Sequence, residues 1–488
     1  MTASRTEVYS PAQVRTMQQY QQQQRRYRLQ QQRAEALKKQ HTVQKALKFV
    51  ERDIQHVLSQ SPFLQQSNPG DHIALFHRSE IETGRRIGKG GFSNVYEITA
   101  FRLHPHYTRL LTEPQQQLRE FYQQQTALGR GRYCIKQLQE SLLDDSPRSF
   151  ECAASDLAVE AAYMSALDHP HILSVRGLPI HGLDSLLEGQ HDGYFLILDQ
   201  LEETLDQSIA RWKRTEDMPL MNKAGYALQL AGALQYLHER GILFRDLKPQ
   251  NLGFSSDGRL QLLDFGLCRE MPAVQQSDEV FEMSGVGTRR YMAVEIINTG
   301  FYNSKADVYS WSMVFWEMLS LGKPYPTYSV NDHKHFVCQG GERPMLDHQW
   351  PLPIQNLLKH SWATNIPERL DMQEVQCLLR TYIECCKLLD ETPESPTGVN
   401  DTSFLSEFSD GLPSAPRLDD FDNEEGGALS DEHAVMMMNL SVQSSIFEKP
   451  SVCTAASTDV SSVGDTYSVA FTPATITPSK SFGRIASY

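Results

Sequence analysis

The segment GILFRDLKPQNLGF, residues 241–254, places polar side chains at short fixed spacings inside an otherwise apolar run. Asp246 is followed by Lys248 and then by Asn251, and a second acid, Asp264, ends the apolar stretch LQLLD. Carboxylate and amide oxygens are the ligands that magnesium prefers, and a carboxylate also accepts a proton from a hydroxyl group. Together these side chains predict a site that offers oxygen ligands and a base.

Two glycines at positions 88 and 90 indicate a phosphate-binding loop. In RRIGKGGFSNVYEI, residues 85–98, Gly88 and Gly90 allow a close approach of backbone amides to an anion. A dinucleotide-binding turn needs a helix directly after its glycines, whereas Val95 and Tyr96 continue as a strand. We therefore expect a hairpin that covers a nucleotide, and an ordinary glycine hairpin remains the alternative at this point.

A lysine and a glutamate further along predict an ion pair. Lys136 lies in the middle of the strand-like GRYCIKQL, where a lysine usually turns to solvent. On the expected helix 155–173, Leu157, Glu160 and Met164 share one apolar stripe, so the glutamate faces the core. Because an unpaired buried carboxylate is costly, Lys136 is its expected partner, and the pair would hold the lysine ready for phosphates.

Taken in chain order, these motifs resemble the eukaryotic protein kinase family, serine/threonine type. The resemblance covers about 300 residues of the sequence. The matching positions are Gly88, Gly90, Lys136, Glu160, Arg245-Asp246, Lys248, Asn251, Asp264-Phe265-Gly266 and Ala293-Val294-Glu295. The stretch GTRRYMAVE is also similar to those of the tyrosine-kinase-like and mitogen-cascade subgroups. The resemblance implies an α+β, bilobal fold with a small β-rich lobe and a large helical lobe, and it implies ATP and Mg²⁺ as cofactors.

The resemblance assigns roles to particular residues. The expected catalytic residues are Asp246, Lys136, Lys248, Glu160 and Thr288, and the expected metal ligands are Asn251 and Asp264. The expected ATP-binding residues are Ile87, Gly88, Gly90, Val95, Cys134, Lys136, Leu198, Asp199 and Leu201. Lys248 and Thr288 match the serine/threonine pattern, so the implied substrates are protein serines and threonines. By the same resemblance, Asp307 braces the catalytic loop and Arg369 pairs with Glu295.

Four residues depart from the family pattern. Phe244 stands where histidine or tyrosine is common, and Ser93 replaces the third glycine of the loop. Val294 replaces the proline of Ala-Pro-Glu, and Gly253 replaces the bulky apolar residue beneath adenine. Phe244, Val294 and Gly253 leave a pseudokinase scaffold, which binds protein partners without catalysis, as the alternative function. A kinase of small molecules fits less well, because the segment ending at Glu295 matches a platform for peptides.

The elements that position these residues divide the chain into three parts. Residues 1–78 form a basic, Gln-rich extension, residues 79–388 form the kinase-like domain, and residues 389–488 form an acidic tail rich in Ser and Thr. Within the domain, strands precede helices, as in an α+β fold, and residues 102–130 read as an inserted loop or helix. The tail has too few large apolar residues to offset its ordering entropy, so we expect it to be disordered, with proline-directed phosphosites at Thr392, Ser395, Thr472 and Thr477.

Within the extension, residues 12–58 lack glycine and proline and predict a helix. Its apolar positions become regular only late, at Val43, Leu47, Val50 and Ile54. A solvated helix or a disordered segment is therefore the favoured interpretation, and a coiled-coil surface for a partner is the alternative.

Composition limits the remaining possibilities. The net charge of −14 combines a basic beginning with the acidic tail, so nucleic acid is not an expected partner. No apolar run is long enough to span a membrane, and the scattered cysteines are expected to be reduced thiols. These features predict a cytoplasmic protein, with a nuclear location as the alternative and an organellar transit peptide disfavoured.

A regulatory site is expected between Asp264 and Thr288. Arg245, a cation beside Asp246, needs an anionic partner, and Arg269 supplies a second cation by resemblance. A phosphate on Ser284, added by an upstream kinase, would bind these cations and order the segment. Constitutive activity, with Arg245 bridged to Glu279, is the alternative.

Overall fold

A computed structural model describes residues 11–67, 73–272, 279–283, 285 and 287–391. The chain divides after Arg380 into two compact units, and the arrangement given below is that of the described residues up to this point. Ser284 and the acidic tail after Glu391 lie outside the described residues, so the predictions made for them stay predictions. Within the described part, no helix combines the length and the apolar character needed to cross a bilayer.

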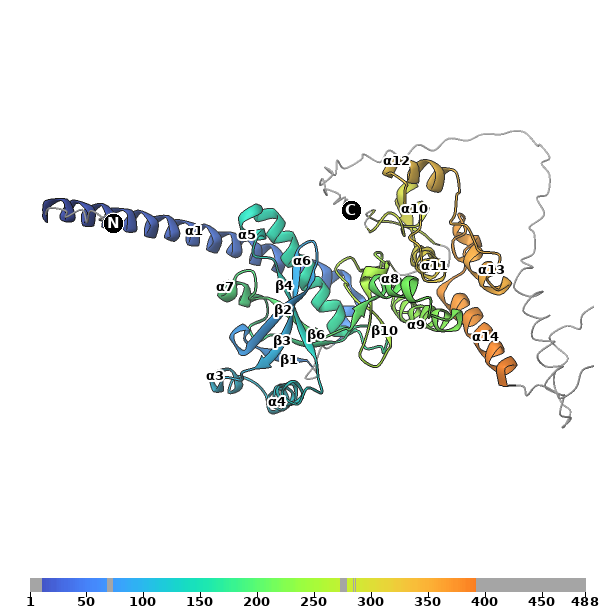
Figure 1. The fold of residues 1–488 in the computed structure, drawn as a ribbon, viewed down its shortest axis with the longest axis horizontal. Helices are drawn as coiled ribbons and strands as arrows, with labels where there is room; N and C mark the ends of the chain where they lie inside the picture. The colour runs from blue at the N-terminus through green and yellow to red at the C-terminus, as the bar shows by residue number, and fades with distance from the viewer. Residues whose placement is uncertain (1–10, 68–72, 273–278, 284, 286, 392–488) are drawn as a thin grey trace, which may run out of the picture. The chain divides into compact units, whose positions relative to one another are not determined.

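One strand-rich lobe is built on a six-stranded sheet, counted over the described residues, in the order β1-β5-β6-β4-β3-β2 (Figure 1). Its strands are β1 (Ala74–Phe76), β2 (Ile81–Lys89), β3 (Ser93–Phe101), β4 (Tyr133–Leu138), β5 (Val175–Pro179) and β6 (Phe195–Asp199). β1 is parallel to β5, and the other neighbours are antiparallel. One face of the sheet packs into a core with Phe76, Phe101, Tyr133 and Phe195.

The helices of this lobe are α3 (Pro105–Thr108), α4 (Glu113–Ala127), α5 (Leu142–Asp145), α6 (Pro147–Ala166) and α7 (Ser185–Gly189). α3 and α4 form the insertion expected over residues 102–130. α4 is anchored to the sheet lobe because Arg119 forms a fully buried ion pair with Glu80 and Tyr122 joins the core. α6 begins with proline at its first turn, which suits the fixed φ of that residue, and it carries Glu160.

The second lobe is mainly helical, as was expected for an α+β, bilobal fold. Its helices are α8 (Leu205–Thr215), α9 (Leu220–His238), α10 (Val294–Asn298), α11 (Lys305–Ser320), α12 (Val330–Asp332), α13 (Leu352–Ser361) and α14 (Met372–Glu391), which runs across the boundary at Arg380. α11 is almost entirely buried and packs against α9, where Trp311 Nε1 donates to Ala227 O at 3.0 Å.

Short strands in the helical lobe fix the loops that carry polar residues. They are β7 (Glu203–Thr204), β8 (Ile242–Leu243), β9 (Leu252–Phe254), β10 (Leu260–Leu262), β11 (Arg269–Glu270), β12 (Phe281–Glu282) and β13 (Phe301–Tyr302). β8 and β9 flank the segment with Asp246 and Asn251, and β10 ends just before Asp264. Antiparallel pairing of β9 with β10 brings these segments together.

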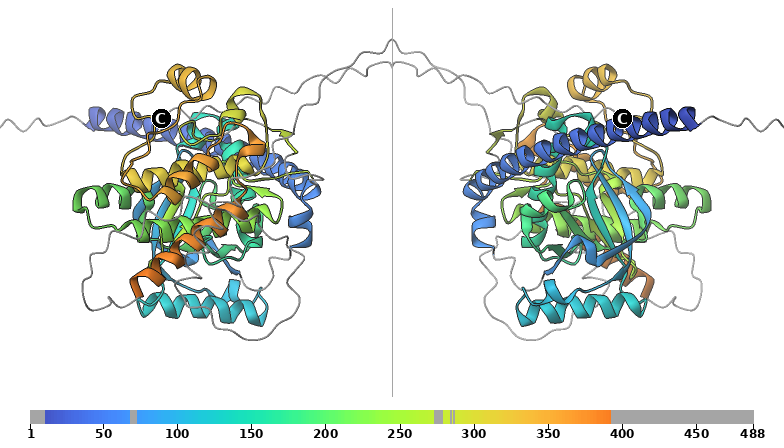
Figure 2. Two further views of the ribbon diagram at one scale, coloured as in Figure 1. Left: turned by 90° about the vertical axis from the view of Figure 1, so that its right-hand side faces the viewer. Right: turned by 90° about the vertical axis from the view of Figure 1, so that its left-hand side faces the viewer.

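The long N-terminal helix α1 (Pro11–Gln60) is followed by the short helix α2 (Pro62–Gln66). Figures 1 and 2 show α1 passing beside α5 and α6, with its earlier part extending beyond them. Residues 19–39 are exposed except for a partly buried Lys39, as a solvated helix requires, but Val43, Ala46, Leu47 and Val50 are buried. Residues well before position 79, where the domain was expected to begin, therefore already pack against it.

Candidate active site

Lys136 lies between two carboxylates that come from different elements. Its Nζ donates to both Oε1 and Oε2 of Glu160, each at 2.7 Å, and to Asp264 Oδ1 at 3.2 Å. The lysine side chain is 13% exposed and that of Glu160 is 4% exposed, whereas Asp264 keeps 47% of its side chain accessible. The Lys136–Glu160 pair expected from the stripe on α6 is thus present, and its lysine faces an accessible acid.

Burial and charge act in opposite directions on these groups. Burial raises the pKa of Glu160 to about 7, although Lys136 opposes this rise. The positive charge of Lys136 holds the pKa of Asp264 below its usual value. Burial lowers the pKa of Lys136, but Asp264 and Glu160 outweigh this effect, so the pKa lies above its ordinary value. Lys136 is therefore a fixed positive charge and Asp264 a fixed negative one at neutral pH.

Asp246 is the centre of a second cluster. Its Oδ1 accepts from Thr288 Oγ1 at 2.8 Å, and its Oδ2 accepts from Lys248 Nζ at 2.7 Å and from Asn251 Nδ2 at 3.1 Å. Lys248 also donates to Thr288 Oγ1 at 3.1 Å. The carboxylate is thereby held in one orientation, with 11% of its side chain exposed.

Backbone conformation supports both clusters. Arg245 and Asp264 have φ angles of 71° and 70°, in the left-handed region that non-glycine residues seldom adopt. Asp307 on α11 holds the first of these turns, because its carboxylate accepts from the backbone N–H groups of Phe244 and Arg245, each at 2.9 Å. His238 Nε2 lies 3.0 Å from the same carboxylate. Asp307 thus braces this loop, as expected.

The glycines lie in a hairpin between β2 and β3. Gly88 is opposite Val95 in the antiparallel register, and Gly90 N donates to Ser93 O at 2.8 Å. A strand follows the glycines, as the sequence predicted. Ile87, next to the hairpin, is 38% exposed.

Three apolar residues expected around adenine lie on neighbouring strands. Val95 on β3 is opposite Lys136 on β4, and Cys134 on β4 is opposite Leu198 on β6. Cys134 and Leu198 are buried. Burial raises the pKa of the Cys134 thiol to about 12, so this cysteine acts as a small apolar residue.

Asp199 and Leu201 stand where the two lobes join. The Asp199 carboxylate accepts a forked pair of bonds from Arg176, with Nε to Oδ1 at 2.9 Å and Nη2 to Oδ2 at 2.7 Å. This contact was not predicted. The sequence gives little indication of it, because Arg176 is an isolated cation in β5. The backbone of the next residue pairs with the sheet lobe, since Gln200 N donates to Arg132 O at 2.9 Å.

Comparison with known proteins settles the family. A sequence model for protein tyrosine and serine/threonine kinases matches residues 81–379, more than half of the chain. This chain belongs to the protein kinase family. The expected sheet-rich and helical lobes are the two lobes of this kinase domain.

Similar curated proteins are kinases that differ in length from this one. Serine/threonine/tyrosine-protein kinase HT1 of Arabidopsis thaliana is 27% identical over 47% of this chain and 55% of its own length. Mitogen-activated protein kinase kinase kinase 7 of Drosophila melanogaster is 26% identical over 56% of this chain and 38% of its own. Serine/threonine-protein kinase PKH2 of Saccharomyces cerevisiae is 28% identical over 39% and 17%, respectively. The chain thus spans about half or less of the length of these relatives.

Two departures from the kinase pattern are accommodated by packing. The ring of Phe244 packs edge-on against that of Phe265, with centroids 5.3 Å apart, and both rings are fully buried. At Gly253, a Cβ atom would lie 2.6 Å from Leu201 Cδ1. The leucine side chain therefore fills the space that a larger residue at position 253 would occupy.

The segment after Thr288 is held by a buried ion pair. Arg369 donates through Nη1 and Nη2 to the two oxygens of Glu295, at 2.7 and 2.9 Å. The expected pairing of these residues is present. Val294, at the first position of α10, is buried, so the residue that replaces proline packs into the lobe.

The two arginines expected to bind a phosphate have contacts of their own. Arg245 donates through Nε to Leu267 O at 2.7 Å and through Nη1 to Tyr302 Oη at 3.2 Å. Arg269 Nη1 donates to Cys268 O at 2.7 Å. Regulation through Ser284 stays a prediction, because this residue lies outside the described ranges.

Proposed function

We propose that the chain transfers the γ-phosphate of ATP to serine and threonine hydroxyls of proteins. Membership of the kinase family supports the reaction class. The observation that carries the proposal is the triangle of Asp246, Lys248 and Thr288, which joins the acid expected to receive the hydroxyl proton to the two residues typical of serine/threonine specificity.

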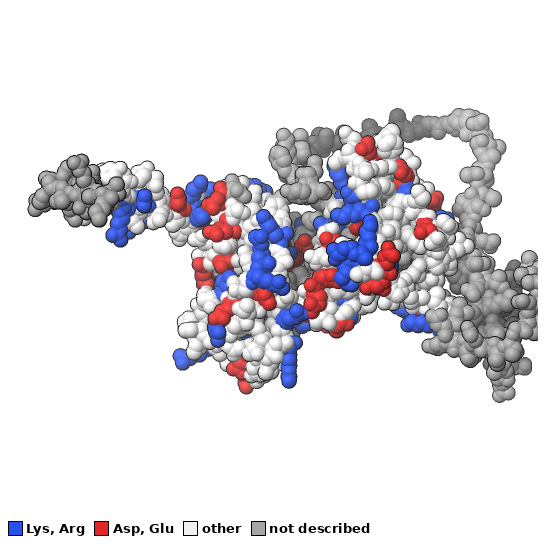
Figure 3. All heavy atoms as spheres, viewed as in Figure 1, with Lys and Arg blue, Asp and Glu red and all other residues white. Residues whose placement is uncertain are grey.

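Each cluster has its own task in this proposal. Asp246 orients the substrate hydroxyl and accepts its proton, and Lys248 offers positive charge beside it. Lys136, fixed by Glu160, binds phosphate oxygens, and the hairpin with Gly88 and Gly90 covers them. Catalysis then consists mainly of positioning and charge stabilisation, since the transferred phosphoryl group spreads its negative charge over its oxygens. Figure 3 shows Lys and Arg on both lobes of one face, with Asp and Glu interspersed among them.

The residues expected to bind magnesium suit that ion. Asn251 Nδ2 donates to Asp246 O at 2.8 Å and to Asp246 Oδ2, while no described residue donates to its Oδ1. Asp264 offers a second hard oxygen and is partly accessible. Within the described part of the chain, no cluster of three or more His, Cys, Asp or Glu forms a complete metal cage. Two protein ligands match Mg²⁺, which commonly completes its shell with water and phosphates. When bound, the ion neutralises phosphate charge.

Partners and location follow from the same proposal. We expect protein substrates and an upstream kinase that acts on Ser284, and the chain is proposed to work in the cytoplasm. One relative is named a mitogen-activated protein kinase kinase kinase, which supports a place in a phosphorylation cascade.

The test is a transfer assay with the purified full-length chain, γ-labelled ATP, Mg²⁺ and a generic protein substrate. We expect label on serine and threonine after acid hydrolysis, and loss of transfer by about 1000-fold or more in Asp246→Asn. Addition of EDTA should also stop the reaction. Equal label incorporation by the wild type and by Asp246→Asn would show that the proposed site does not carry the activity.

A further inference from the structure

The second half of α1 and the helix α2 pack against α6, the helix that carries Glu160. Val43, Ala46, Leu47 and Val50 on α1 are buried, and so is Leu64 on α2. The four residues on α1 recur at helical spacing and form one apolar face. An apolar face of this length that is removed from water stabilises the packed arrangement.

Side chains also tie α1 directly to α6. Asp53 accepts a hydrogen bond from Ser155, which lies on α6 little more than one turn before Glu160. At the start of α6, the guanidinium of Arg148 lies 4.5 Å from the ring centre of Phe49. These contacts fix the position of α6 along α1.

The start of α2 makes a third tie, to the helical lobe. Ser61 caps α2, and its Oγ donates to Glu270 Oε1 at 2.6 Å, while Phe63 N donates to the same oxygen at 3.1 Å. Glu270 belongs to β11, which follows the Asp264 segment and pairs with β8, the strand that leads into the Asp246 loop. Ser61 and Phe63 are thus bonded to a side chain on the segment that connects both acidic centres.

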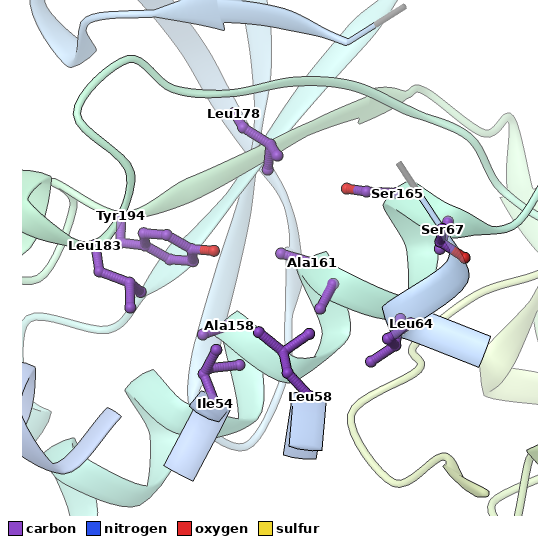
Figure 4. Close-up of a pocket in the computed structure, with 12 residues that line it drawn as sticks. Ile54, Leu58, Leu64, Ser67, Ala158, Ala161, Ser165, Leu178, Leu183 and Tyr194 are labelled. Carbon is purple, nitrogen blue, oxygen red and sulfur yellow. The ribbon is translucent and has the colours of Figure 1, made fainter. Parts of the chain in front are cut away.

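The contact between these helices is incompletely packed at one place. A cavity of about 200 Å³ lies between them. Figure 4 shows Ile54 and Leu58 of α1 on one side of it and Ala158, Ala161 and Ser165 of α6 on another. Side chains across a cavity do not touch, so they do not fix the relative position of the two helices. The polar ties of Asp53 and Ser61 therefore carry much of the positional information.

We propose that residues 42–66, here called the brace, are a built-in positioning element that holds α6 and β11 in the arrangement where Glu160 pairs with Lys136. Among the described residues, no contact joins the brace to Lys136 or to Asp246. The residues of the brace are therefore positioning residues. Its effect on catalysis rests on the proposed kinase function. Its effect on α6 does not, because the ties to Ser155 and Glu270 are features of the fold.

The test uses the full-length chain with the serine hydrogen bond of each tie removed, in the double variant Ser61→Ala/Ser155→Ala. We expect kcat to fall about tenfold, because two hydrogen bonds that favour the braced arrangement are lost. The KM for the protein substrate should stay unchanged, since the brace contacts α6 and Glu270 and does not form the Thr288 segment. Amide hydrogen exchange in residues 153–166 should become about tenfold faster.

Two single variants serve as matched controls. Ser59→Ala removes an exposed hydroxyl that donates to His56 O within α1, at 2.8 Å, and should leave kcat and exchange unchanged. Glu270→Gln keeps a side-chain oxygen for Ser61 and Phe63 and should retain most activity, whereas Glu270→Ala should behave like the double variant.

The outcomes separate this proposal from the proposed function. Wild-type kcat together with wild-type exchange in the double variant would overturn the brace, and so would a loss of kcat in Glu270→Gln equal to that in Glu270→Ala. If Tm and kcat fell together and amide exchange became faster by the same factor over the whole lobe, the brace would only stabilise the fold in general. That result would overturn the proposal. If the wild type transfers no phosphate, the exchange of residues 153–166 still decides the matter.

Discussion

Lys136 Nζ lies 3.2 Å from Asp264 Oδ1 while it keeps both bonds to Glu160. One ammonium group therefore donates hydrogen bonds to a buried glutamate and to a partly exposed aspartate that come from different lobes. This arrangement explains why the pKa of Asp264 is held low although burial acts to raise it. The lysine therefore favours the ionised form of Asp264 as well as offering its own charge.

Replacement of Lys136 by methionine tests this relationship. Lys136→Met removes the cation expected to bind phosphate, so kcat/KM for ATP should fall by about 100-fold or more. The pKa of Asp264 should rise as well, because the attracting charge is lost. Steady-state kinetics checks the first effect, and circular dichroism checks that the fold persists. Lys213→Met, at an exposed position on α8, is the control and should retain full activity.

Part of this site was accessible from local periodicity and short spacings, and the resemblance to protein kinases implied the rest, such as the roles of Thr288 and Asp307. The stripe on α6 placed Glu160 toward the core, and the hairpin followed from strand residues after Gly90. The contact between Lys136 and Asp264 was not predicted. It depends on the left-handed backbone conformation of Asp264, which the residue types of Asp264-Phe265-Gly266 do not indicate. The apolar pattern on α1 from Val43 onward was visible in the sequence, but its partner on α6, about 100 residues away, was not.

The packing of Leu201 over Gly253 predicts an unusual response to a larger residue. Gly253→Leu places a Cβ within 2.6 Å of Leu201 Cδ1, so the leucine must leave its position near the expected adenine site. The KM for ATP should rise about tenfold, although the substitution restores the residue type common in the family. Leu201→Ala in the same chain should recover most of this loss, because the two side chains compete for one space. Additive effects of the two substitutions on KM would contradict this account.

Ser165 predicts a stabilising substitution beside the cavity. Its Oγ is buried and has no hydrogen-bond partner among the described residues. Ser165→Ala removes an unsatisfied hydroxyl, so the free energy of unfolding should rise by about 1 kcal/mol. Ser312, also buried on a helix, donates to Tyr309 O at 2.6 Å, and Ser312→Ala should instead lower it. Thermal denaturation of both variants provides the comparison, and equal shifts in Tm would argue against this explanation.

Glu317 makes stability depend on pH in a direction opposite to that of most carboxylates. It lies on α11, is 2% exposed and accepts a hydrogen bond from Tyr291 Oη at 2.7 Å. Burial raises its pKa from 4.5 to about 7 despite that bond. As pH rises from 4.5 to 7, the unfolded chain releases this proton first while the folded chain retains it. Folding stability should therefore fall across this range through Glu317.

Glu317→Gln removes the titrating group and keeps an oxygen acceptor for Tyr291. The decline of the free energy of unfolding between pH 5 and pH 7 should become shallower by about one proton's worth, on the order of 1.4 kcal/mol per pH unit. Some decline should remain, because the pKa of Glu160 is also raised to about 7. Urea denaturation at several pH values measures the slope, with exposed Glu120→Gln as the matched control. An identical slope in wild type and Glu317→Gln would mean that Glu317 titrates at its ordinary pKa in the folded chain.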